Sequence, residues 1–135
     1  MTAYARRMTT VRFAGAFVAL VGVVLACFPT LVSDPGPAAD TFEAIERRIP
    51  WGTLAGVGAL FVARTRLRPF WTSIAAVVCW VTSGILVARL IGLVLDGADS
   101  GRQWMWVGVE VVVIALAAAY LVRARNRDES RGRLG

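Results

Sequence analysis

The chain has 135 residues, of which 57% are hydrophobic and only 18% charged, and its mean hydropathy is +0.63. A soluble domain has about 45–50% apolar and about 25% charged residues, so this composition indicates a membrane protein. All 15 basic residues are arginines and the net charge is +6, but the arginines lie in short clusters between apolar runs. Such clusters are typical of membrane-topology signals, and we therefore expect no nucleic-acid partner.

The sequence lacks the residue combinations that metal, redox and catalytic sites use. The sequence has no histidine, and its two cysteines, Cys27 and Cys79, lie within apolar runs. Their expected depths differ by roughly 8–12 Å, which exceeds disulfide reach, so both are interpreted as packing residues. We find no nucleophile with a plausible base, no paired carboxylates in the membrane and no glycine-rich phosphate loop. The sequence predicts no enzyme, no metal site and no cofactor.

The first apolar run, residues 13–32, follows a polar segment at residues 1–12 that carries three arginines. About 20 residues at ~1.5 Å per residue match a hydrocarbon core of ~30 Å, so this run is the first predicted span. A signal peptide is an alternative, because a basic start precedes the run and Val24–Cys27 resembles a lipoprotein cleavage box. Leu25 fits that box poorly, which favours the membrane span.

The longest polar connection, residues 33–50, begins with a turn at Ser33–Pro37. Asp40 or Thr41 is then expected to cap a short helix that lies at the membrane interface.

The second span is predicted at residues 47–63, although its apolar part has only 13 residues. That part is too short to cross a bilayer alone, so Arg47 and Arg48 are placed at the headgroups, with a bend at Pro50. A re-entrant segment is the alternative. Gly52 and Gly56 have the spacing of a close helix-packing contact.

The third and fourth spans are predicted at residues 71–95 and 104–122, joined by a polar turn, and the charged tail at residues 124–135 is expected to be mobile. The amino-terminal segment has three arginines, residues 64–68 have three and residues 123–135 have five, whereas three lie on the opposite side. This asymmetry predicts cytoplasmic termini. The expected fold is an all-α integral membrane protein: four transmembrane helices in an antiparallel bundle over residues 13–123.

Two charged residues lie inside the last two spans. Arg89 is about 10 Å and Glu110 about 9 Å below the same outer boundary, counted at the helical rise from the span ends. An isolated charge at the centre of a span costs roughly 2.5–3.5 kcal/mol, and a facing partner offsets much of that cost. We therefore predict a partly buried Arg89–Glu110 ion pair, with Asp96 as a possible competitor for the guanidinium.

The predicted pair has two interpretations. It is either a structural contact that fixes helix register, which is favoured, or part of a site for an anionic or polar ligand such as a lipid headgroup. In the second case Arg47, Arg48 and Asp96 are candidate ligand contacts, because they lie towards the same face of the membrane.

Residues 89–97, with Glu110 in the next helix, resemble a bacterial family of small four-helix membrane proteins known only as a domain of unknown function. That family has an arginine late in its third helix, an acidic-glycine turn after it and a glutamate in its fourth helix. Glu46–Arg48 and Gly52 are similar to its charged start of the second helix. The resemblance covers roughly residues 10–122 and implies the four-helix fold but no reaction.

Function is expected to be non-catalytic. The small size and the absence of catalytic groups favour an accessory or structural subunit of a larger bacterial inner-membrane complex, with lipids and other integral membrane proteins as partners. The alternative is a protein that binds or transports a lipid or small molecule through the arginine and glutamate site in the outer half of the membrane. A continuous polar cavity that reaches Arg89 would favour this alternative, whereas a closed, dry pair would favour the subunit.

Overall fold

The computed structural model describes residues 3–32, 36–63, 70–98 and 100–132, and these residues form helices and connections without a strand. The helices are α1 (Ala3–Cys27), the short 3-10 helix η1 (Pro29–Leu31), α2 (Thr41–Glu46), α3 (Ile49–Ala63), α4 (Phe70–Leu95) and α5 (Gly101–Gly132). The all-helical fold class is thus confirmed.

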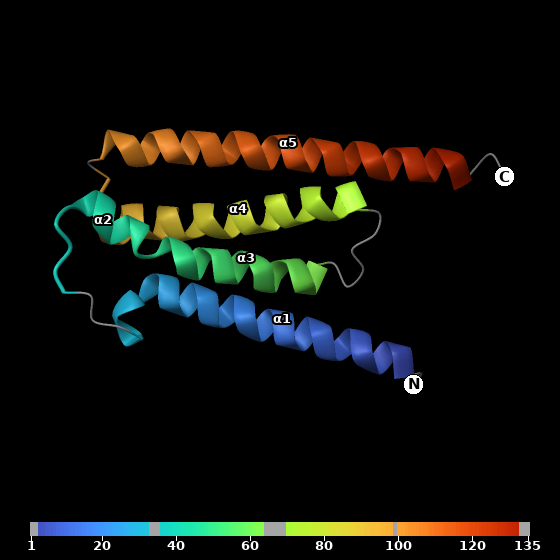
Figure 1. The fold of residues 1–135 in the computed structure, drawn as a ribbon, viewed down its shortest axis with the longest axis horizontal. Coiled ribbons are helices and arrows are strands. Elements are labelled where there is room, and N and C mark those ends of the chain that lie inside the picture. The colour runs from blue at the N-terminus through green and yellow to red at the C-terminus, as the bar shows by residue number, and fades with distance from the viewer. Residues whose placement is uncertain (1–2, 33–35, 64–69, 99, 133–135) are drawn as a thin grey trace.

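The four long helices lie side by side in an open row (Figure 1). In that row α1 packs against α3, α3 against α4, and α4 against α5. Neighbouring helices run antiparallel, so N and C lie on the same side of the molecule along the helix axes, and α2 lies on the opposite side against α4 (Figure 1). The helices at the two edges of the row, α1 and α5, therefore keep much of their surface free of other helices.

Three helices of the described chain are long and apolar enough to cross a membrane, over Met8–Cys27, Trp71–Leu95 and Gly101–Arg127. Large apolar side chains on the edge helices are exposed, among them Phe13 and Leu116 at 73% and 68%. Exposed apolar surface on helices whose backbone hydrogen bonds are internally satisfied is what a bilayer requires. The chain is thus a multi-pass membrane protein.

The first helix ends earlier than the apolar run of residues 13–32 suggests. It stops at Cys27, and η1 begins at Pro29. Proline has no N–H to donate and disfavours helical dihedrals in the residue before it, which here is Phe28. The apolar character of the sequence continues past this point, but the helix does not.

The last helix extends well beyond the apolar run of residues 104–122. It reaches Gly132, so most of the segment that was expected to be a mobile tail continues the helix. Arginine, the commonest residue of this segment, has high helix propensity, and charge alone does not end a helix.

The connection to α3 follows the expected capping pattern. The Asp40 side chain accepts a hydrogen bond of 2.7 Å from the backbone N–H of Glu43 and caps α2. The chain then turns at residues 47–48, and α3 begins at Ile49 with Pro50 in its first turn, where the missing proline N–H breaks no helical hydrogen bond. The turn therefore lies just before the proline.

Part of the turn expected at residues 33–37, and the arginines of residues 64–68, lie outside the described residues.

Glycines let α3 approach its two neighbours closely. A Cβ atom added to Gly52 would lie 2.5 Å from the carbonyl oxygen of Gly84 in α4, and one added to Gly56 would meet the carbonyl oxygen of Trp80. On the α1 side, a Cβ atom on Gly22 would lie 2.5 Å from the backbone nitrogen of Ala55. Backbone-to-backbone packing of this kind is the main way that helices associate without a hydrophobic driving force.

Replacing Gly84 with alanine is expected to lower the free energy of unfolding by about 1–3 kcal/mol, because α3 and α4 must move apart. The added Cβ would meet the backbones of Gly52 and Gly56. The measurement is thermal unfolding in detergent micelles. Gly108→Ala is the matched control, since a Cβ atom there has no neighbour within 4 Å and alanine favours a helix. Equal melting temperatures for the two variants would contradict this packing.

Candidate functional site

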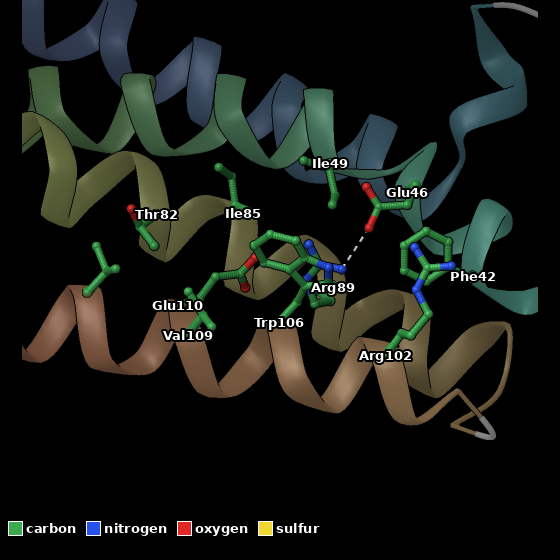
Figure 2. Close-up of a pocket in the computed structure, with 11 residues that line it drawn as sticks. Phe42, Glu46, Ile49, Thr82, Ile85, Arg89, Arg102, Trp106, Val109 and Glu110 are labelled. Atoms are coloured by element: carbon green, nitrogen blue, oxygen red, sulfur yellow. Dashed lines mark hydrogen bonds and ion pairs between the residues drawn. The ribbon is translucent and has the colours of Figure 1, made fainter.

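Arg89 is the centre of a buried cluster of polar side chains from three helices. Its side chain, on α4, is almost fully buried. Nε donates to Oε1 of Glu110 on α5 at 3.0 Å, and Nη1 donates to Oε1 of Glu46 on α2 at 2.9 Å, the contact drawn in Figure 2. Nη1 also donates to Oε1 of Gln103 on α5. We call these four residues the Arg89 cluster.

Local packing brings α2 and α5 to this arginine. Ile45 of α2 is completely buried against Gly92 of α4. A Cβ atom added to Gly92 would lie only 2.9 Å from Cγ1 of Ile45, so the contact requires glycine. Gln103 and Glu110 are seven residues apart, so they lie on one face of α5, two turns from each other. The amide nitrogen of Gln103 donates to the backbone carbonyl of Phe42 at 3.2 Å, which ties α5 to α2.

A second buried arginine, Arg48, joins the ends of three segments. Its Nε and Nη2 each donate to a carboxylate oxygen of Asp96, both at 2.7 Å. Its Nη1 donates to the backbone carbonyls of Ala26 at 2.6 Å and Cys27 at 2.9 Å. These carbonyls belong to the last turn of α1 and have no partner within the helix. Arg48 thus caps α1 and holds it to the turn that follows α4.

Arg47, the neighbouring arginine, is held outside the membrane-spanning helices. Its guanidinium donates to Oε1 of Glu43 at 2.7 Å and to the backbone carbonyl of Gly36 at 2.7 Å. The pKa of Glu43 is lowered, first because the backbone N–H of Ala39 donates to its carboxylate and second because Arg47 does. These contacts fold the polar connection back onto α2.

A cavity of about 410 Å³ lies beside the Arg89 cluster, between α2, α4 and α5. Figure 2 shows Arg89 and the carboxylates of Glu46 and Glu110 on its wall, together with Trp106. The guanidinium of Arg102 lies 4.1 Å from the centre of the Phe42 ring, which is a cation–π geometry. The cavity therefore combines charged groups with aromatic and aliphatic walls.

One polar atom of Glu110, a residue that lines this cavity, lacks a partner. Among the described residues, Oε2 of Glu110 is the only buried side-chain nitrogen or oxygen with no hydrogen bond. Most buried polar atoms in proteins are hydrogen-bonded, and leaving one unpaired costs about 1–3 kcal/mol, so the unpaired oxygen of Glu110 requires an explanation.

A second cavity of about 320 Å³ lies between α4 and α5, closer to the ends of the chain. Its walls are almost entirely apolar and include Trp71, Val78, Leu116 and Tyr120. Val113 lines both cavities, so the two adjoin along the α4–α5 contact. We call the pair of cavities the α4–α5 groove, which has a polar end at Arg89 and an apolar end at Tyr120.

The structure brings Arg89 and Glu110 together, as the depth estimate predicts, but it distributes the other expected ligand contacts differently. Asp96 pairs with Arg48 and leaves Arg89 to other partners. Arg47 and Arg48 donate to the protein's own oxygens, so neither guanidinium faces the groove.

Sequence reasoning missed two members of the cluster, Glu46 and Gln103. The heptad spacing of Gln103 from Glu110 was an available signal. Glu46 had no such signal, because its position depends on how α2 folds over α4.

The described residues offer no metal site and no redox pair. No group of three histidine, cysteine, aspartate or glutamate residues among them is arranged to hold a metal ion. Cys27 and Cys79 are free thiols, each partly buried. What the groove presents is an arrangement of charged groups next to an open apolar depression.

Comparison with known proteins places the chain in a family without assigning a reaction. No curated protein and no solved structure gives a significant match. A family profile described as "Domain of unknown function (DUF4345)" matches residues 7–121. This match covers α3, α4 and parts of α1 and α5, includes the whole Arg89 cluster, and confirms the resemblance to an uncharacterised family. The chain belongs to the family of the domain of unknown function DUF4345.

Proposed function

We propose that the protein is a non-catalytic membrane protein that binds a lipid-like amphiphile in the α4–α5 groove. The observation that carries the proposal is the juxtaposition of a charged cavity and an apolar cavity that share Val113. An amphiphile has one polar and one apolar end, and the groove provides a matching environment for each. A polar cavity that reaches Arg89 also favours a ligand-binding site over an ion pair that only holds two helices together.

The dimensions of the groove support this proposal. The two cavities of about 410 and 320 Å³ fall within the range of about 300–1,000 Å³ that is typical of small-molecule sites. From Glu110 to Tyr120 the groove follows ten residues of α5, which is about 15 Å at the helical rise. That length suits a medium-length alkyl chain lying along the two helices.

The proposed topology has four spans with both termini in the cytoplasm of a bacterium, in the inner membrane. The distribution of arginines supports this orientation. N and C lie on the same side of the molecule along the helix axes, which agrees with an even number of membrane crossings (Figure 1). In this topology α3, with 15 residues, completes its crossing with the help of the turn at residues 47–48 at headgroup level.

The test is a substitution that fills the groove. Val113→Trp is expected to reduce the amphiphile that remains bound through purification in mild detergent by at least tenfold, as counted by native mass spectrometry. Val112→Trp is the matched control, because Val112 is exposed, lies next in sequence and lines neither cavity. Equal retention of bound amphiphile by the two variants, or none on the unsubstituted protein, would refute the proposal.

A second candidate is an accessory subunit of a larger membrane complex. It is favoured by the outward face of α5, where Met105 and Val112 are each more than half exposed. A partner helix could pack there as well as lipid. Purification of the tagged protein from its native membrane, with mass spectrometry of co-eluting proteins, tests this candidate. A stoichiometric membrane partner would support it, and elution without any protein partner would refute it.

A further inference from the structure

The charges around Arg89 do not balance within the cluster. One guanidinium, on Arg89, faces two carboxylates, on Glu46 and Glu110, while Gln103 is neutral. The other ion pairs of the described chain, Arg48 with Asp96 and Arg47 with Glu43, are each neutral on their own. The Glu46 side chain is 38% exposed, whereas that of Glu110 is 9% exposed. With both glutamates ionised, the polar end of the groove has one surplus negative charge, which is costly at the buried Glu110.

Arg102 is the only other cation that lines the polar cavity, and it does not neutralise this surplus. Its side chain is exposed and stacks on Phe42, and it has no carboxylate partner within the 4.0 Å limit of an ion pair among the described residues. An exposed charge at the rim is screened by solvent and interacts weakly with a buried carboxylate.

The hydrogen bonds point to the same deficit. Oε1 of Glu110 accepts from Arg89, but the buried Oε2 has no donor. If the carboxylate is ionised, Oε2 lacks a donor. If it is protonated on Oε2, the hydroxyl lacks an acceptor. A donor from outside the chain satisfies the ionised form, and a positively charged donor also removes the surplus charge.

From these two observations we infer that the polar group recognised in the groove is an alkylammonium, which donates to the Glu110 carboxylate once that side chain turns Oε2 towards the cavity, while its chain lies along Val113 towards Tyr120. The inference rests on the proposed binding function and specifies its ligand class. It also reverses the expectation of an anionic ligand at Arg89. Nε and Nη1 of Arg89 already donate to Glu46, Glu110 and Gln103, and an anion in the cavity would face the two carboxylates.

The test compares probes that share a chain and differ in the headgroup. The full-length protein in phosphatidylcholine nanodiscs is incubated with dodecylammonium, dodecanol or dodecanoate, and the adduct retained on the protein is measured by native mass spectrometry. Choline headgroups carry no N–H donor and do not mimic the probe. Dodecylammonium is expected to be retained at least tenfold more than either other probe. Ethylammonium, which lacks the chain, is expected not to be retained.

Substitutions then locate the headgroup. Glu110→Gln is expected to reduce retention of dodecylammonium at least tenfold, to the level of dodecanol. Glu43→Gln is the matched control, because it removes a carboxylate of α2 that does not line the groove, and it is expected to leave retention unchanged. If Glu110→Gln fails to fold, the headgroup preference of the unsubstituted protein still decides the matter.

The outcomes separate this inference from the proposed function. If dodecanoate or dodecanol is retained as well as dodecylammonium, and Val113→Trp abolishes that retention, the groove binds amphiphiles but the ammonium assignment is wrong. Retention of ethylammonium equal to that of dodecylammonium would also overturn the inference, because the apolar end would then be unused. If Val113→Trp changes the retention of no probe, the proposed function itself fails.

Discussion

Replacing Arg89 with methionine is expected to cost about 3–5 kcal/mol of unfolding free energy, the largest effect of any single substitution considered. The side chain is 3% exposed and donates to three acceptors on two other helices. Without the guanidinium, the buried carboxylate of Glu110 loses its partner, and removing one member of a buried pair costs more than the pair contributes. Thermal unfolding in detergent micelles measures the effect.

Two companion variants distinguish the buried charge from the loss of side-chain packing. The double variant Arg89→Met with Glu110→Met is expected to recover a large part of the lost stability, since no uncompensated charge remains at that contact. Arg102→Met, which removes an exposed arginine of the same site, is expected to cost less than about 1 kcal/mol. If the double variant is no more stable than Arg89→Met alone, the ion pair is not the reason for the loss.

Arg48→Met is expected to have the second largest effect, roughly 2–3 kcal/mol, because it removes the Asp96 pair and leaves two carbonyls of α1 without donors. The loss should be local as well as global. Hydrogen–deuterium exchange is expected to rise in the last turn of α1 and in the turn after Leu95, and less in the middle of α4.

The neighbouring arginine provides the control for this prediction. Arg47→Met removes a partly exposed pair with Glu43 and is expected to change stability by less than about 1 kcal/mol, without faster exchange in α1. Similar exchange in α1 for both variants would show that Arg48 does not cap that helix.

Much of the fold could be predicted from hydropathy because membrane helices must be continuous and apolar. The runs at residues 71–95 and 104–122 lie within α4 and α5. The helix ends were harder to predict, because they depend on local backbone chemistry that hydropathy ignores. Pro29 ends α1 while the sequence is still apolar, and α5 continues through charged residues. The open row could not be predicted at all, since sequence spacing does not say which helices are neighbours.

The part of the candidate site that depends on depth along a helix could be predicted from the sequence. The part that depends on how the turn between α2 and α3 folds could not. Counting residues from the span ends places Arg89 and Glu110 at one level, and they pair at 3.0 Å. The partners of Arg48 are different. They depend on how α2 turns at residues 47–48, which brings Arg48 to Asp96 and leaves Glu46 to Arg89. The period of a helix does not say which way the side chains of adjacent residues in such a turn point.

The position of Glu46 on α2 has a consequence for biosynthesis. Ribosomes make the chain from its amino terminus, so Glu46 emerges 43 residues before Arg89, and Glu110 emerges 21 residues after it. When α4 leaves the ribosome, its arginine therefore already has a carboxylate available, before α5 has been made. The second carboxylate arrives with the last helix. The order of these three residues along the chain thus gives Arg89 a carboxylate partner before the last helix is made.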